Sequence, residues 1–234
     1  MRVLYVFIVA IIVAGGIYWY VQNKQQPQRL SSEAQRGSFE AQSQDGEPPS
    51  APFALQDGTY TVVAEESSIG WEGRKPLLAN YKDTGSLKLK NGSAEVKDGK
   101  VASGTLVFDM TTIQAGKTGK GIGEEALTGH LKSEAFFDAG KYPTAMFVLQ
   151  QAVDQGANTY LLRGELTIKG ITNPVEIPAA LSIQGDAIAL RADMHLDRTL
   201  WDIRYGSGKF FDNLADNVID DTFGATFALT FKKS

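Results

Sequence analysis

The 234-residue chain is 43% hydrophobic, which is enough for one substantial domain to bury a core without metals or disulfides. It contains no cysteine, so disulfides, thiolate nucleophiles and thiolate metal sites are excluded. The formal net charge of -4 disfavours nucleic acid as a partner, because phosphate binding relies on clustered lysine and arginine side chains.

The first hydrophobic segment, Val3–Val21, is an uncharged run of about nineteen residues, close to the ~20 that a membrane-spanning helix requires. A Tyr-Trp-Tyr sequence near its C-terminal edge suits the headgroup region of a bilayer. We therefore predict a single-pass anchor over residues 1–21. The alternative is a signal peptide cleaved at a weak small-residue site near position 14, although the apolar run continues past that point.

The next segment, residues 22–56, is rich in Gln, Ser, Glu and Pro and contains too few apolar residues to form a core. We expect a flexible linker, whose roughly 35 residues would reach about 30–35 Å as a random coil. The folded domain is then expected over residues 57–234.

In this domain, short runs of alternating apolar and polar residues recur between turn signals, which is the pattern of antiparallel strands with one buried face. The clearest run is the last one, where Phe223, Phe227 and Phe231 share one face. Strands are expected at Tyr60–Glu66, Ile69–Arg74, Gly85–Lys90, Ser93–Lys97, Val101–Ile113, Thr144–Val153, Tyr160–Ile168, Val175–Ile183, Ile188–Leu196 and Thr222–Lys232.

The connections between these strands are mostly short. Asp98-Gly99 and Gly185-Asp186 predict tight hairpin turns, and Asp154–Asn158 predicts a longer one. A short helix is expected near Glu124–Ser133, where apolar residues recur at helical spacing. Eight or more strands with one short helix must form a sandwich or close into a barrel, so the fold class is all-β.

Two glycine-rich segments imitate nucleotide-binding motifs. Gly116-Lys117-Thr118 ends like a phosphate-binding loop, but Thr111 stands where the first glycine of that motif is required. Gly121 and Gly123 imitate a dinucleotide fingerprint, but no parallel βαβ unit surrounds them. Neither motif supports nucleotide binding.

The chain has only two histidines, which leaves little material for a catalytic triad or for a multi-histidine metal site. His195 alternates with apolar neighbours and is expected to face outward from a strand. His130 shares a helix face with Leu127 and Leu131, and it either packs as a structural residue or contacts a ligand headgroup. The acidic segment 212–221 lacks the glycine, spacing and final glutamate of an EF-hand, so its carboxylates are expected in turns or in solvent.

An ordered set of motifs begins in the predicted helix and continues into the next strand. It consists of Gly129-His130-Leu131-Lys132-Ser133, then Phe136-Phe137-Asp138, then Lys141-Tyr142-Pro143 and Phe147. This set resembles the signature of the YceI-like family. Further matching segments are Ile69–Gly73, Gly164–Gly170, Asp197–Thr199 and Trp201. The resemblance covers about residues 57–232, and several motifs in the same order are more specific than any one of them.

The resemblance implies an extended, lipocalin-like antiparallel β-barrel of about eight strands, which holds a polyisoprenoid chain such as that of a quinone or a prenyl phosphate. An eight-stranded barrel can enclose one small ligand, and each Å² of lipid surface removed from water contributes roughly 25 cal/mol. The residues expected to contact the lipid are Trp71, Phe108, Met110, His130, Phe136, Phe137, Phe147, Leu162, Leu166, Trp201, Phe223 and Phe227. The alternative is that these side chains fill the barrel as an ordinary core.

Members of the family are usually exported, so the resemblance implies a periplasmic domain, held at the inner membrane by residues 1–21 or released after cleavage. The positive charges flanking that segment do not by themselves favour export. No catalytic cofactor is required, and a homodimer is one open alternative for the assembly. The leading function is storage, sequestration or transfer of an isoprenoid lipid. An envelope interaction scaffold with a filled barrel is the alternative, and an enzyme using Asp109 or Asp138 is least favoured.

Overall fold

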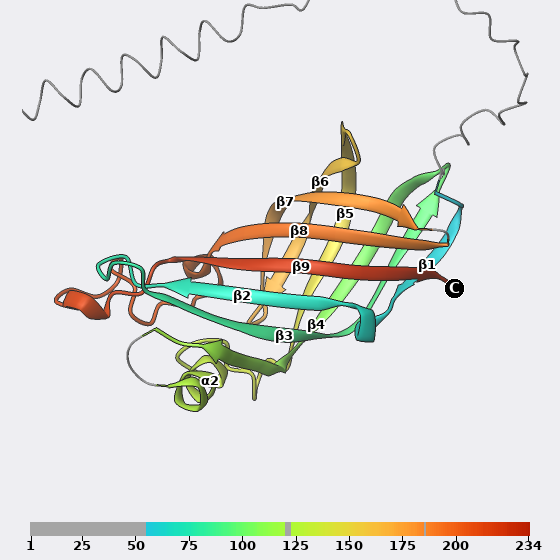
Figure 1. Cartoon of the computed structure of the whole chain (residues 1–234). Coiled ribbons are helices and arrows are strands. Elements are labelled where there is room, and N and C mark those ends of the chain that lie inside the picture. The colour runs from blue at the N-terminus through green and yellow to red at the C-terminus, as the bar shows by residue number, and fades with distance from the viewer. Residues whose placement is uncertain (1–54, 120–122, 185) are drawn as a thin grey trace, which may run out of the picture. The chain divides into compact units, whose positions relative to one another are not determined.

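The computed structural model describes residues 55–119, 123–184 and 186–234, and in this part of the chain nine strands form one antiparallel sheet (Figure 1). The predicted anchor and almost all of the predicted linker lie outside these residues. Within the described ranges, no helix has the length and apolar character that crossing a membrane would need.

The elements follow one another in the order of their labels. The strands are β1 (Gly58–Val62), β2 (Ser68–Arg74), β3 (Lys82–Lys97), β4 (Lys100–Lys117), β5 (Thr144–Gly156), β6 (Thr159–Ile168), β7 (Ile171–Gln184), β8 (Ala187–Asp197) and β9 (Thr222–Lys233). The helical elements are α2 (Glu124–Lys132) and the short 3-10 helices η1 (Ala64–Glu66), η2 (Arg198–Trp201) and η3 (Ala215–Asn217).

The sheet closes on itself. The strands from β3 to β9 pair in sequence order, each with the next. The first and last of them, β3 and β9, both pair with β1 and with β2. The short helix η1 separates β1 from β2, but both strands lie between β3 and β9. Together they therefore occupy the position of one strand in the barrel. The nine strands therefore form an eight-stranded antiparallel barrel, as the family resemblance predicted, and not the sandwich that the strand pattern alone left open.

The interior face follows the period-2 pattern of the sequence. In β7, Val175, Ile177 and Ala179 are buried, whereas Glu176 and Pro178 between them are exposed. The predicted faces of β6, β8 and β9 point inward in the same way, because successive side chains of a strand point to opposite sides of the sheet. His195 on β8 is exposed, as expected.

Three local predictions were wrong. Gly85–Lys90 and Ser93–Lys97 are one strand, β3, because Gly92 lies where a Cβ would be 2.7 Å from Leu106 and so serves close packing and not a turn. The predicted first strand stops at Val62, where η1 begins. The connection predicted over Asp154–Asn158 shortens to the two residues between β5 and β6, which adopt φ angles of 52° and 61°.

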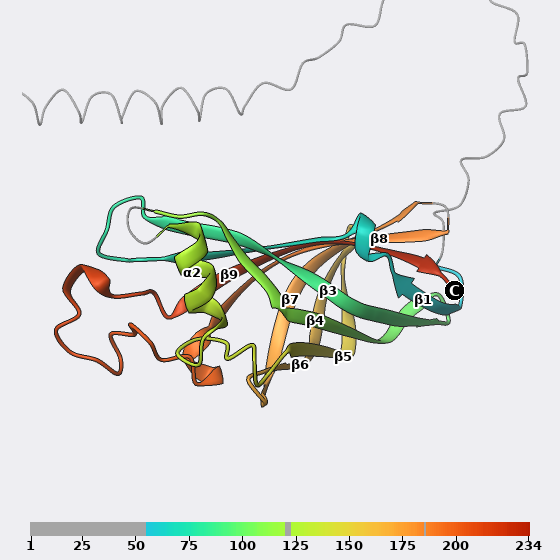
Figure 2. The same cartoon turned by 90° about the horizontal axis from the view of Figure 1, so that it is seen from below.

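The two ends of the barrel differ. One end, which we call the hairpin end, carries the tight turns β3–β4, β5–β6 and β7–β8 together with Leu55 and the C-terminal Ser234. The other, which we call the cavity end, carries the β2–β3 loop, α2, the β6–β7 turn and the long β8–β9 segment (Figures 1 and 2). There α2 is tied to β4, whose Ala115 N–H donates to Thr128 Oγ1 at 2.9 Å.

Gly164 on β6 marks a close approach inside the barrel wall. A Cβ at this position would lie 2.3 Å from the Val148 carbonyl oxygen and 2.8 Å from the Phe147 ring. We expect Gly164→Ala to lower the free energy of unfolding by about 1–3 kcal/mol, the usual cost of overpacking. Urea denaturation measures this. The control is Gly73→Ala on β2, whose Cβ would meet no atom within 4 Å; equal losses in both variants would contradict the prediction.

Candidate functional site

The barrel interior holds an apolar cavity of about 130 Å³ at the cavity end. Side chains from seven strands and from α2 line it, so the closed sheet itself makes its wall. Polar side chains enter the lining mainly near the rim, at Glu72, Arg198, Asp220 and Thr222. The apolar members are mostly large and include two methionines, Met110 and Met194, whose flexible side chains adapt to irregular shapes.

The structure brings most of the predicted lipid-contacting residues together. Those that line this cavity are Trp71, Phe108, Met110, Phe136, Phe137, Leu166, Phe223 and Phe227. Phe147 and Leu162 instead line a second cavity of about 50 Å³ nearer the hairpin end. His130 and Trp201 line neither cavity. These positions describe the apolar lining, and contact of any of these residues with a lipid remains a prediction.

A packed layer separates the two cavities. Along the inner face of β9, Phe227 lines the first cavity, Phe231 lines the second, and Leu229 lies between them with only 1% of its surface exposed. Phe108 packs against Phe227 with ring centroids 6.0 Å apart. The interior is therefore neither a continuous tunnel nor a completely filled core.

His130 is part of an aromatic cluster between α2 and the β8–β9 segment. Its ring lies edge-on to Phe136 and to Tyr205, with centroids 4.9 and 4.5 Å away. Phe136 lines the cavity, so His130 supports the lining from behind without entering it. Of the two interpretations of His130, this geometry favours the structural one, because edge-to-face aromatic packing holds the ring in place.

Trp201 is likewise a packing residue. Its side chain is completely buried, and its indole N–H donates to the Leu166 carbonyl at 3.0 Å. Leu166 belongs to β6 and lines the cavity, so this hydrogen bond connects η2 to the barrel wall. Trp201 therefore lies behind the lining of the described cavities, and its predicted contact with a lipid stays a prediction.

Arg198 is the main residue of the site that the pattern of apolar faces did not predict. Only 3% of it is exposed, and its guanidinium donates to the carbonyl oxygens of Ile203, Tyr205, Ile219 and Asp220 at 2.7 to 3.1 Å. A buried arginine therefore connects the beginning of the β8–β9 segment, at Ile203 and Tyr205, to its end, at Ile219 and Asp220. The one available signal was its place in the Asp197–Thr199 motif.

The carboxylates around Arg198 form ion pairs. Burial lowers the pKa of Arg198, which the charge of Asp221, with Oδ1 3.5 Å from Nη2, partly offsets. Lys209 Nζ lies 2.7 Å from Asp197 Oδ2 and 3.3 Å from Asp221 Oδ2. Asp197 also accepts hydrogen bonds from the amide and the hydroxyl of Thr199, which caps η2.

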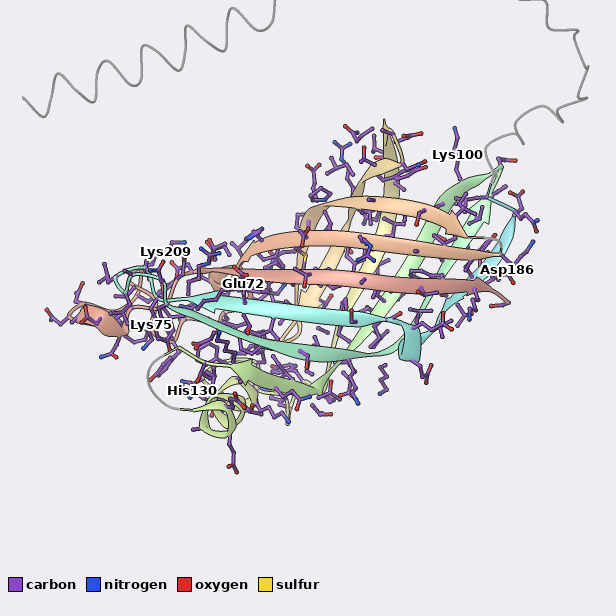
Figure 3. All side chains as sticks on the ribbon, viewed as in Figure 1. Glu72, Lys75, Lys100, His130, Asp186 and Lys209 are labelled. Carbon is purple, nitrogen blue, oxygen red and sulfur yellow. The ribbon has the colours of Figure 1, made fainter. Side chains whose placement is uncertain are left out.

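The rim residue Glu72 on β2 is also paired. Hydrogen bonds from Lys82 and Arg74 lower the pKa of Glu72, although burial opposes the shift. Figure 3 shows Glu72 and Lys209 at the same end of the barrel. Among the residues that the structure describes, no three His, Cys, Asp or Glu side chains come close enough to hold a metal ion.

We expect Arg198→Gln to lower the free energy of unfolding by about 3–5 kcal/mol, because it removes one partner of a buried ion pair and leaves backbone carbonyls without donors. Amides of the 198–221 segment should also exchange with solvent faster than in the natural chain. The matched control is Arg191→Gln, an exposed position on β8, the strand that precedes η2. Equal exchange rates in the two variants would contradict the role assigned to Arg198.

Asp197 makes this segment sensitive to acid. Burial raises its pKa, but the hydrogen bonds from Lys209 and Thr199 outweigh burial and hold the pKa below its ordinary value of about 3.9. The stabilisation is therefore complete above the ordinary pKa and is lost as the pH falls through the lower folded-state pKa. The natural chain should be more stable to urea than Asp197→Asn at pH 6, and this difference should shrink below pH ~4. A difference that stays constant from pH 6 to pH 3 would contradict the prediction, and Asp193→Asn, an exposed position on β8, is the control.

Comparison with known proteins agrees with this architecture. The UPF0312 protein of Vibrio vulnificus is 32% identical over 84 residues, which are 33% of this chain and 44% of the relative. That of Pseudomonas syringae pv. tomato is 32% identical over 89 residues, or 35% and 46% of the two chains. The chain thus spans less than half the length of these curated relatives.

Solved structures show the same fold. BcnA of Burkholderia cenocepacia has a TM-score of 0.59 at 21% identity, covering 72% of this chain and 98% of BcnA. A polyisoprenoid binding domain from Saccharophagus degradans has a TM-score of 0.57 at 17% identity, covering 75% of this chain and 98% of that domain. The model of the YceI-like domain matches residues 60–231, which include all nine strands in whole or in large part. The chain therefore belongs to the family of YceI-like domains.

Proposed function

We propose that the barrel binds the apolar chain of an isoprenoid lipid in the 130 Å³ cavity at the cavity end, for storage, sequestration or transfer. The observation that carries this proposal is the cavity itself, which is lined by large apolar side chains and has its polar groups near the rim. Ligand sites commonly combine such a lining with a few placed polar groups. The fold shared with the polyisoprenoid binding domain of Saccharophagus degradans supports the same ligand class.

The size of the cavity sets how the lipid must enter. A cavity of about 150 Å³ holds a benzene-sized molecule, so the 130 Å³ here suits roughly one isoprene unit in the resting arrangement. A longer chain would continue into the second cavity only if the layer around Leu229 and Phe227 moved aside. Side-chain rotation in that layer is then part of binding, and the methionines of the lining help to accommodate it.

The rim favours an uncharged headgroup. Arg198 already donates to four carbonyl oxygens, and Arg74 and Lys82 are paired with Glu72. A phosphate would therefore have to break existing ion pairs to gain a cationic partner. We infer that a quinone ring or an alcohol suits this rim better than a prenyl phosphate.

The proposal includes the membrane. The apolar run at residues 3–21 supports an anchor in the inner membrane with the barrel in the periplasm, where it would stay close to membrane lipids. This part of the proposal rests on the sequence and on the usual export of the family. Protease digestion of spheroplasts tests the side on which the barrel lies, and protection of the barrel from added protease would overturn a periplasmic location.

The second candidate is an interaction scaffold with a filled barrel. The packed layer around Leu229 favours it, because it leaves no continuous tunnel in the interior. An enzyme is less well supported, since neither Asp109 nor Asp138 lines the cavity. Asp109 instead accepts hydrogen bonds from the amide and hydroxyl of Thr111.

Mass spectrometry of solvent extracts separates the two candidates. The full chain, purified gently from its own membranes, should release an isoprenoid lipid in near-stoichiometric amount. Repeated extraction of no lipid, together with no binding of added prenyl quinone or prenyl alcohol, would exclude lipid binding and leave the scaffold.

A substitution inside the cavity provides the matched test. Ala225 on β9 lines the cavity, and Ala228 on the same strand faces away from it. Ala225→Leu should reduce binding of a prenyl quinone at least tenfold, because the added atoms occupy the space of the lipid chain. Ala228→Leu should bind like the natural chain. Fluorescence titration measures both affinities, and circular dichroism checks that each variant is folded; unchanged binding in folded Ala225→Leu would place the lipid elsewhere.

A further inference from the structure

The exposed apolar side chains are distributed very unevenly between the two ends of the barrel. In the described part of the chain, every large hydrophobic residue that is exposed belongs to a loop or a strand start at the cavity end. These residues are Leu77, Met146, Ile171, Leu200, Tyr205, Phe210 and Phe211. The hairpin end presents polar turns such as Asp98-Gly99 and the segment around Asp186 (Figure 3).

The most prominent of these residues are held in place by the fold. Phe210 and Phe211 are 45% and 50% exposed, yet their amides donate to the carbonyl of the completely buried Ser207 at 3.2 and 3.1 Å. The Arg204 guanidinium stacks 4.8 Å from the Phe210 ring centroid. Two adjacent phenylalanines are thus presented to solvent on a tight, anchored turn, which is costly unless a partner covers them.

We propose that the cavity end docks on the surface of a phospholipid bilayer, with Phe210, Phe211 and Leu77 inserted at the level of the headgroups. The proposal goes beyond lipid binding by the barrel, since it names the surface against which the cavity rim is placed. Its first support is position. The Asp220 amide donates to the Arg74 carbonyl at 2.9 Å, which joins the β8–β9 segment to the strand that carries the rim residue Glu72.

A bilayer suits these residues better than a protein partner. They protrude from two separate loops, β2–β3 and β8–β9, so they match a soft surface that several tips can enter independently. Lys75 lies two residues before Leu77, and a long cationic side chain of this kind can extend to lipid phosphates while an apolar tip lies below them. Arg204 and Lys209, near the phenylalanines, are paired with Asp202 and with Asp197 and Asp221. The β8–β9 segment contains more Asp than Lys and Arg, so docking depends on apolar insertion and not on net charge.

The length of the N-terminal segment permits this orientation. The domain begins at the hairpin end, where Gln56 accepts a hydrogen bond from Tyr60 and Asp57 accepts one from the amide of Gly99. The longest strand has 18 residues, so the barrel is on the order of 40–50 Å long once strand tilt is included. About 33 residues separate the predicted anchor from Leu55, and they span up to roughly 110 Å when extended. A linker of this length lets the cavity end reach the bilayer although the anchor is attached at the opposite end.

The absence of natural cysteine makes a direct test available. Two single-cysteine variants of the full chain, Phe211→Cys at the cavity end and Lys100→Cys at the hairpin end, each carry one nitroxide label and are reconstituted in phosphatidylcholine vesicles. Figure 3 shows that Lys100 lies far from Lys209, which belongs to the same segment as Phe211. Power saturation with oxygen and with a water-soluble nickel chelate then reports the depth of each label. The label at 211 should lie about 5–10 Å into the headgroup and acyl boundary, and the label at 100 should stay in water. Both results should persist at high salt.

Equal exposure of the two labels to the nickel chelate would overturn the proposal. Protection of the label at 211 only when other membrane proteins are added would also overturn it, because that result would indicate a protein partner. A label introduced by Leu77→Cys provides a second measurement, and combining it with Phe210→Ser and Phe211→Ser should move that label into water. The same triple variant should still release lipid on extraction. Insertion of the label, with no extracted lipid and no binding of added prenyl quinone or prenyl alcohol, would support docking and exclude lipid binding. The two proposals therefore fail separately.

Discussion

The closure of the sheet is the constraint on which the rest of this structure depends. Two short strands, β1 and β2, lie between β3 and β9 and pair with both of them. Without these two strands the sheet would be open. Closure pairs the edge strands, so that no long edge is left to template aggregation, and it turns one face of every strand into an interior. The interior of an eight-stranded barrel can be filled by side chains or can hold one small ligand, and here the inward side chains leave an apolar cavity.

A closed barrel still needs its ends organised, and at the cavity end this depends on one buried cation. Arg198 binds carbonyl oxygens from both arms of the β8–β9 segment, and its charge is offset by Asp221 and by the nearby Asp197 and Asp220. Four carbonyl acceptors compensate much of the cost of burying a guanidinium. The same segment carries the exposed phenylalanines, so the residue that shapes the rim also determines which side chains the barrel presents to its surroundings.

The interior combines order with adaptability. Leu229 and the Phe108–Phe227 pair form a layer between two cavities, and this layer keeps the empty barrel well packed. Methionines on the cavity side can change rotamer at little cost, whereas the strands cannot move apart without breaking ladder hydrogen bonds. A lipid chain that enters would therefore displace side chains and not backbone.

Sequence patterns alone predicted most of the strands and their inward faces, because alternation with period 2 is a local property that each strand displays independently of its partners. An ordered set of motifs predicted the family. The sequence also located most of the cavity lining, since large apolar residues on inward faces have few other places to go. It did not determine that His130 and Trp201 stand behind the lining, that Leu229 divides the interior, or that Arg198 gathers the loop above it. Those facts depend on which strands pair, in what register, and on how the β8–β9 segment folds back over the barrel, and only the tertiary structure brings such distant residues together.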